Sequence, residues 1–180
     1  MADYKEKMIS SKKIYDGRII NLRVDEVALP DGKTSKREIV EYAGAVAVVP
    51  INEKGELLLV RQYRYAVGET LLEIPAGKIE PGEDYASSAG RELTEETGYT
   101  AGNLKHLISF YSTPGFTNEQ IHLFLATELS LKKQSLDEDE FIDVETVSMK
   151  QAPEMIMSGK IRDAKSVAGI LTALRFLEAK

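Results

Sequence analysis

The stretch from residue 77 to residue 99 constrains the fold most, because it marks both ends of one helix. Asp84 is a residue type that caps helix N-termini, and Gly98 readily adopts the left-handed conformation that ends a helix. Between them, small and apolar residues recur every three or four positions, which predicts one face packed against a core. The residues of that face are Ala86, Ala89 or Gly90, Leu93 and Thr97.

Three glutamates project from the same predicted helix. Glu92, Glu95 and Glu96 stand at i, i+3 and i+4, so their carboxylates lie on one side. Like charges at this spacing destabilise an isolated helix by roughly 0.2–0.5 kcal/mol per pair. A divalent cation offsets this repulsion, since Mg²⁺ takes a few carboxylates and keeps other positions for water and phosphate oxygens. Arg91 precedes Glu95 by four residues, so an exposed acidic helix with one salt bridge also accounts for the spacing.

The acidic residues of the chain gather in two segments. The 180 residues carry a formal net charge of −6; residues 79–99 hold six acids and one arginine, and residues 134–146 hold six acids and no base. Two such clusters suit hard cations, although charge runs are also common on solvated faces. No basic stripe is visible, so no nucleic-acid partner is expected. The absence of cysteine excludes disulfides and a cysteine nucleophile, and two histidines cannot form a three-histidine metal site.

The remaining patterns predict a mixed α/β (α+β) fold of six or more strands and about three helices. Alternation over residues 13–42, with a long strand from Arg18 to Leu29 and a turn at Pro30-Asp-Gly, predicts an N-terminal antiparallel β meander. We therefore expect a meander over residues 1–43 and a main domain over residues 44–180. Apolar runs predict a buried hairpin from strands at 46–51 and 56–65. Further strands are expected at 104–111, 121–129 and 141–147, and helices at 149–158 and 164–177, the last with Val167, Ile170, Leu171 and Leu174 on one face.

Hydropathy bears on localisation. No apolar run approaches the roughly 20 residues of a membrane span. The N-terminal segment also lacks the apolar core of a signal peptide. We therefore expect a cytoplasmic protein with no membrane partner.

The residues around the glutamate helix match a known pattern. The sequence Gly77, Glu83, Arg91, Glu92, Leu93, Glu95, Glu96, Gly98 and Tyr99 reproduces the Nudix box GX5EX7REUXEEXGU without departure, U being a bulky apolar or aromatic residue. The chain thus resembles the Nudix hydrolase superfamily over nearly its whole length. The resemblance implies a mixed β-sheet sandwiched between helices. It also implies metal-assisted hydrolysis of a nucleoside diphosphate linked to another group, with Mg²⁺ as cofactor and Mn²⁺ as the alternative.

The same resemblance assigns roles to individual residues. The implied metal ligands are Glu92, Glu96, the further or shared ligand Glu95, and the backbone carbonyl of Ala76. Arg91 would orient the carboxylates. The motif positions Gly77, Glu83 and Gly98 would shape the loop and the helix, with Gly77 keeping the backbone close to the metal.

Segments outside the box resemble the ADP-ribose pyrophosphatase subfamily. Pro114 lies 15 residues after Tyr99 in a loop over 112–119, and residues 37–41, 61–64 and 159–165 resemble further segments of that subfamily. The implied substrate contacts are Arg37 and Glu41 to the adenosine part, Arg64 to the diphosphate, Gly115 in the proline loop, and Glu119 to the terminal ribose. Tyr15 would stack on adenine, unless it is a half-buried strand tyrosine.

The second acidic segment and the meander also gain roles from the resemblance. Residues 137–144 resemble an acidic loop whose glutamate before an apolar residue is the catalytic base, which indicates Glu140, with Glu138 as the alternative. A solvated loop without a catalytic role is the other interpretation. In the subfamily the meander is exchanged across a two-fold axis, so a homodimer is expected, with Arg37 and Glu41 contributed by the partner.

The expected function is hydrolysis of ADP-ribose, a small-molecule substrate, to AMP and ribose 5-phosphate. Other nucleoside diphosphate sugars remain the alternative, because the pocket for the terminal sugar cannot be read from sequence. A non-catalytic nucleotide-sugar sensing module is disfavoured by the intact box and by a length that leaves no room for a DNA-binding domain. Isomerases of this fold depend on a cysteine, which is absent here.

Overall fold

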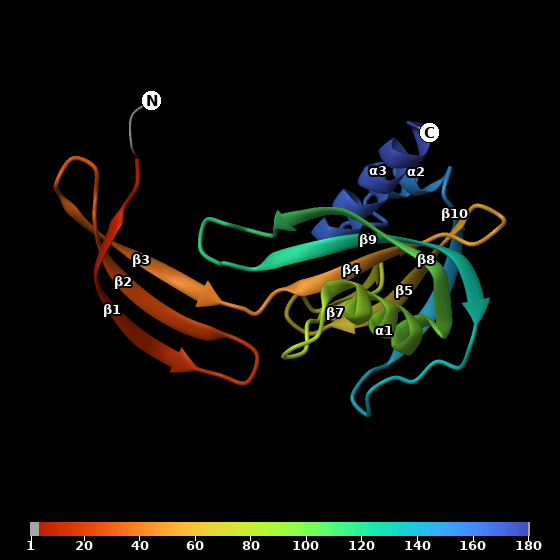
Figure 1. Ribbon diagram of the computed structural model, residues 1–180, viewed down its shortest axis with the longest axis horizontal. Coiled ribbons are helices and arrows are strands. Elements are labelled where there is room, and N and C mark those ends of the chain that lie inside the picture. Colours follow the sequence, from red (N-terminus) through yellow and green to blue (C-terminus); the bar gives the residue numbers. More distant parts are fainter. Residues whose placement is uncertain (1–3, 180) are drawn as a thin grey trace. The chain divides into compact units, whose positions relative to one another are not determined.

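The computed structural model describes residues 4–179 and divides into two compact units (Figure 1). The first unit comprises residues 1–44 and 111–120, and the second comprises residues 45–110 and 121–180. The ranges expected from sequence, 1–43 and 44–180, include residues 1–3 and 180, which lie outside the described part.

The first unit contains the expected meander, a three-stranded antiparallel sheet. Its order is β1 (Lys7–Asp16), β2 (Asn21–Ala28) and β3 (Thr34–Glu41). The long strand expected from Arg18 is wrong at its start, since a turn in which the Gly17 N–H donates to the Ile20 carbonyl at 3.1 Å separates β1 from β2. β1 is exposed along its whole length, so no alternation of burial marks it in the sequence.

The proline loop belongs to this first unit. The Val40 N–H donates to the Phe116 carbonyl at 2.8 Å, and Val40 also forms a parallel bridge with Thr117. The Tyr42 N–H donates to Oδ1 of Asn118 at 2.9 Å. These bonds fix the loop beside the end of β3.

The second unit contains two sheets. A four-stranded mixed sheet has the order β7 (Ala76–Lys78), β4 (Ala45–Pro50), β9 (Gln120–Leu131) and β8 (Tyr99–Tyr111), with β4 and β9 parallel. A three-stranded antiparallel sheet has the order β10 (Ile142–Ser148), β5 (Glu56–Arg64) and β6 (Glu69–Glu73). The predicted β4–β5 hairpin is reduced to one antiparallel bridge between Ile51 and Leu57, because the two strands otherwise lie in different sheets. Each of them is largely buried and has a neighbour on both edges, which explains its continuous apolar run.

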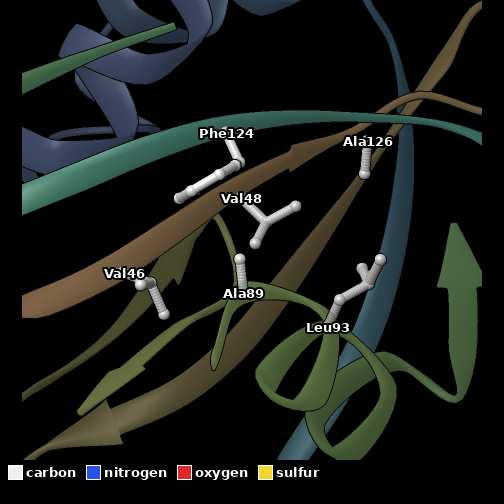
Figure 2. Packing of buried hydrophobic residues seen from close by; sticks show 6 residues of the cluster. All are labelled: Val46, Val48, Ala89, Leu93, Phe124 and Ala126. Carbon is white, nitrogen blue, oxygen red and sulfur yellow. The ribbon is translucent and has the colours of Figure 1, made fainter. Parts of the chain in front are cut away.

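Helices cover both faces of β4. Helix α1 (Tyr85–Thr97) places Ala89 and Leu93 against Val46 and Val48 of β4 and against Phe124 and Ala126 of β9 (Figure 2). Helix α3 (Ala164–Glu178) places Gly169 against Val49 and Leu123, the alternate residues of the same strands. The expected sheet between helices is thus confirmed.

Three helical details differ from expectation. Ala86 of α1 and Leu171 of α3 are exposed. The buried face of α1 begins at Ser88, two positions later than expected, and the buried face of α3 is shifted by one position, to Ser166, Gly169, Ile170 and Ala173. Helix α2 (Ala152–Met157) is shorter than the predicted 149–158. Among the described residues, no helix is long and apolar enough to cross a membrane.

Candidate active site

The ends of α1 are held as the sequence predicts. The Asp84 carboxylate accepts hydrogen bonds from the N–H groups of Ala86 at 3.0 Å and Ser87 at 3.1 Å. Gly98 has a φ of 73° and its N–H donates to the Thr94 carbonyl at 2.9 Å. Both caps fix where the glutamates of the last two turns lie relative to the sheet.

Arg91 is the centre of the carboxylate cluster. Its Nη1 donates to Glu92 at 2.8 Å and to Glu95 at 3.0 Å, so the expected i, i+4 ion pair is present. Its Nη2 donates to Glu83 and to the Lys78 carbonyl, both at 3.0 Å. One guanidinium therefore ties the turn before α1 to the glutamates on the helix and reduces their mutual repulsion.

Glu83 is the carboxylate most strongly held by this cation. Hydrogen bonds from Arg91 and then from Ser88 lower the pKa of Glu83 to about 2. The pKa of Arg91 is raised in turn, chiefly by its hydrogen bond to Glu83. Glu83 is therefore a fixed anion that anchors Arg91 at neutral pH.

Glu96 differs from its two neighbours because it is buried. The residue is 3% exposed, and its carboxylate accepts the N–H of Ala76, the first residue of β7, at 3.1 Å. Burial raises the pKa of Glu96 to about 8, and the charges of Glu92 and Glu140 add to the rise. Helix spacing predicted that all three glutamates lie on one side of the helix. Only the structure shows that one of them, Glu96, is removed from solvent.

Gly77 on β7 makes room for Glu92. A Cβ atom at position 77 would overlap the Glu92 carboxylate, so a side chain there would displace it. Burial is also the main cause that raises the pKa of Glu92, against the opposing effect of Arg91. The glycine of the box is required here for space and not for a left-handed backbone.

The donor set fits a hard divalent cation in its chemistry. Glu92, Glu95, Glu96 and the β7 backbone offer oxygen ligands of the kind that Mg²⁺ and Mn²⁺ prefer. Glu96 is buried and Glu92 is half-buried, and burial raises the pKa of both, an effect that a bound cation would offset. Within residues 4–179, however, no three acidic or histidine side chains converge on one cation position. In this structure the carboxylates face Arg91 and the Ala76 N–H instead.

The acidic loop lies next to the C-terminal turn of α1. Gln134 donates from Nε2 to the Glu96 carbonyl at 2.6 Å and to the Ile142 carbonyl at 3.4 Å, so it holds both ends of the loop. Glu140 is exposed, and its charge acts on Glu92 and Glu96. Glu138 is exposed in the same loop. The anchoring by Gln134 had no signal in the sequence.

Arg64 lies at the end of β5 and is tied to a second charge cluster. Its Nε and Nη2 donate to the two carboxylate oxygens of Glu73, each at 2.8 Å. Lys165 also pairs with Glu73. Sequence reasoning missed Glu73, although a glutamate inside the apolar run of residues 71–74 was a usable signal.

The other predicted substrate contacts lie in the first unit. Arg37 pairs with Glu6, and Glu41 forms an ion pair with Arg23, with 3.0 Å between Oε1 and Nε. Glu119 accepts from the Ser112 hydroxyl, which braces the proline loop. Tyr15 and Gly115 are exposed, so Tyr15 is not the half-buried strand tyrosine of the alternative interpretation. The structure thus places these five positions in one unit, and Arg64 with all the carboxylates of α1 in the other.

Comparison with known proteins places the chain among characterised relatives. Residues 41–168 match the family model described as NUDIX domain, and residues 6–40 match the model described as nucleoside diphosphate sugar hydrolase N-terminal domain. The chain is 44% identical over 182 residues to an ADP-ribose pyrophosphatase of Bacillus subtilis (strain 168), covering 100% of this chain and 96% of that protein. It is 46% identical over 169 residues to a methanol dehydrogenase activator of Bacillus methanolicus, covering 93% and 91%. A crystal structure of an ADP compounds hydrolase superposes with a TM-score of 0.90 at 21% identity, covering 99% and 97% of the two chains, and shows the same fold.

Proposed function

Because the chain belongs to the Nudix hydrolase family, we propose that it hydrolyses the pyrophosphate bond of ADP-ribose to AMP and ribose 5-phosphate. The observation that carries this proposal is the complete carboxylate helix, with Glu83 and Arg91 bracing Glu92 and Glu95 beside the buried Glu96. The relative from Bacillus subtilis, named for the same reaction, supports the choice of substrate.

The carboxylates of α1 hold the cofactor in this proposal. Glu92 and Glu96, with Glu95 and the Ala76 carbonyl, bind Mg²⁺, and Mn²⁺ is the alternative. Bound divalent cations neutralise the negative oxygens of a pyrophosphate and lower the pKa of the attacking water. Arg91 orients the carboxylates through its ion pairs with Glu83, Glu92 and Glu95. Arg64 binds the diphosphate of the substrate.

Glu140 is the proposed general base. It takes one proton from the water that attacks phosphorus, while the bond between that phosphorus and the bridging oxygen breaks and AMP and ribose 5-phosphate separate. Its charge already acts on Glu92 and Glu96, which supports this role. Glu138, two residues earlier, is the alternative base.

We further propose a cytoplasmic homodimer in which the first unit contributes Tyr15, Arg37, Glu41, Gly115 and Glu119 to substrate binding. β1 is exposed throughout and includes Met8, Ile9 and Ile14, which supports burial of this strand against a second copy. Sedimentation at micromolar concentration should give about twice the mass of the 20.0 kDa chain. A monomer with full activity would contradict both the dimer and the shared site.

A broader pyrophosphatase for nucleoside diphosphate sugars is the second candidate. The match of residues 6–40 to the nucleoside diphosphate sugar hydrolase N-terminal domain favours it. The two candidates differ in the sugar that the site accepts and not in the chemistry at phosphorus.

One assay tests both candidates. The purified protein is incubated with Mg²⁺ and with ADP-ribose or a panel of nucleoside diphosphate sugars. Added phosphatase then releases phosphate from the monoester products but not from the intact substrates. The highest kcat/KM is expected for ADP-ribose, and a higher value for another sugar would establish the second candidate. No phosphate release from any compound would contradict the proposed function.

A further inference from the structure

Arg64 belongs to a charge cluster that is centred on a buried carboxylate. Glu73, at the end of β6, is 1% exposed. Burial opposes its ionisation, but the hydrogen bonds and charges of Arg64 and Lys165 outweigh that effect and lower its pKa. An ionised carboxylate in the interior is costly, and an apolar residue often serves stability as well or better. The chain therefore has a reason other than stability to place a glutamate here.

The cluster joins the consecutive strands β5 and β6 to α3, which is distant from them in sequence. Arg64 comes from β5, Glu73 from β6, and Lys165 from the first turn of α3. Lys165 also pairs with Asp163 at 3.0 Å, and Asp163 caps α3 by accepting the Ser166 N–H at 3.0 Å. The Ser166 hydroxyl in turn accepts the Ile74 N–H at 2.8 Å, directly after Glu73. Glu73 is thus held by α3 through Lys165 as well as by Arg64.

This arrangement sets the plane of one guanidinium. Two parallel hydrogen bonds of 2.8 Å between Arg64 and both oxygens of Glu73 fix its rotation as well as its position. The arginine side chain is 40% exposed, and its charge acts on Glu96 of the carboxylate helix. Nη1 takes no part in the pair with Glu73. An arginine ordered in advance loses less conformational entropy when it binds a phosphate oxygen.

We propose that Glu73 and Lys165 are positioning residues that hold the guanidinium of Arg64 in the orientation in which it binds a diphosphate. The proposal rests on the role of Arg64 in the proposed function. It also gives a role to Asp163 and Lys165 of the segment 159–165.

The test is a double-mutant cycle on diphosphate binding. Glu73→Gln, Arg64→Ala and the double variant are titrated with ADP and Mg²⁺ by calorimetry, so that binding is measured without turnover. Glu73→Gln should weaken ADP binding by about tenfold, in line with the loss of a charged hydrogen-bond pair. Arg64→Ala should weaken it at least as much, and the double variant should equal Arg64→Ala because nothing remains to be positioned.

Two further variants make the result specific. Lys165→Met should weaken ADP binding in the same direction by a smaller factor, since Glu73 keeps its bond to Arg64. Glu145→Gln removes the partner of Arg61 on the same strand β5 and should leave ADP binding unchanged. If Glu73→Gln does not fold, Glu73→Asp replaces it in the cycle, because the shorter carboxylate cannot reach both nitrogens of Arg64.

The outcomes separate the two proposals. Equal weakening by Glu73→Gln with and without Arg64 would overturn the positioning role and leave a purely structural one. Wild-type protein that does not bind ADP would overturn it as well. Wild-type protein that binds ADP with the expected cycle but cleaves no substrate would overturn the proposed function and keep the positioning role.

Discussion

The two acidic segments are alike in composition and differ in how the fold uses them. In the first, Glu83, Glu92 and Glu95 share Arg91, and Glu96 is buried against the Ala76 N–H. In the second, residues 137–140 are exposed, and the Asp137 N–H donates to Glu140 within the same loop at 3.2 Å. A count of carboxylates therefore says little about their role. Burial and the shared guanidinium of Arg91 preorganise the first group, whereas the carboxylates of residues 137–140 remain in solvent.

The sharpest test of this contrast is Glu96→Gln. The change keeps the shape and removes the charge, so we expect kcat to fall by several orders of magnitude with a weaker dependence on Mg²⁺. Thermal stability without metal should not fall, because Glu96 with a pKa of about 8 is already mostly uncharged at neutral pH and glutamine keeps an oxygen that can accept the Ala76 N–H. Turnover near that of the wild type at saturating Mg²⁺ would show that Glu96 is not a metal ligand.

The exposed segment is tested by Glu140→Gln. A general base contributes about 10²–10⁴-fold, so kcat should fall by that order while KM and the melting temperature stay nearly constant. Glu138→Gln is the matched control in the same loop and should do much less. If Glu138→Gln is the variant with the large loss of kcat, the base is Glu138 and not Glu140. If neither substitution lowers kcat, the base lies outside this loop.

Gly77→Ala tests how closely the first segment is packed. The added Cβ would overlap the Glu92 carboxylate and displace it, and a displacement of about 1 Å in an active site costs up to about 10²-fold in rate. We expect a loss of about tenfold to 10²-fold in kcat. Gly90→Ala on α1 is the control, since its Cβ would only reach ordinary contact with Leu104 at 3.4 Å. An equal loss in both variants would argue against a specific role for Gly77.

The two acidic segments should also differ in how much they contribute to the free energy of unfolding. Asp84→Ala removes the N-cap of α1 and should destabilise the protein by about 1 kcal/mol in denaturant unfolding. Asp137→Ala, an acid of the exposed loop, should change the free energy of unfolding by less than about 0.5 kcal/mol. Equal destabilisation would mean that the loop is a structural element.

The smallest effect concerns acid stability. The pKa of Glu83 is lowered in the folded state from 4.5 to about 2 by Arg91 and Ser88, so its contribution to stability is present above about pH 5. That contribution is lost as the pH falls toward 2, because the unfolded state takes up the proton first. Glu83→Gln should flatten this part of the melting-temperature profile, and Glu138→Gln should leave it unchanged. An identical profile for wild type and Glu83→Gln would contradict the assignment.

The local features of the site were readable from the sequence. The Asp84 cap, the Gly98 stop and the pair between Arg91 and Glu95 all connect residues within four positions of one another. Their geometry follows from helix spacing, whatever the rest of the fold does. The meander and the apolar strand runs were readable for a similar reason, since turn residues and alternation are local signals.

Only the tertiary structure decided which of these residues are buried and which distant residues they meet. β4 and β5 look like a hairpin in the sequence but find their partners in separate sheets. Glu96 looks like its neighbours in the sequence, but the fold buries it and pairs it with the Ala76 N–H, and Glu73 meets Lys165 only in the folded chain. These contacts join residues 20 to 92 positions apart, and desolvation depends on every element around a group at once. The sequence by itself therefore determined the carboxylate helix and its family pattern. The packing decided that Glu96 is buried and that Arg64 is held by Glu73.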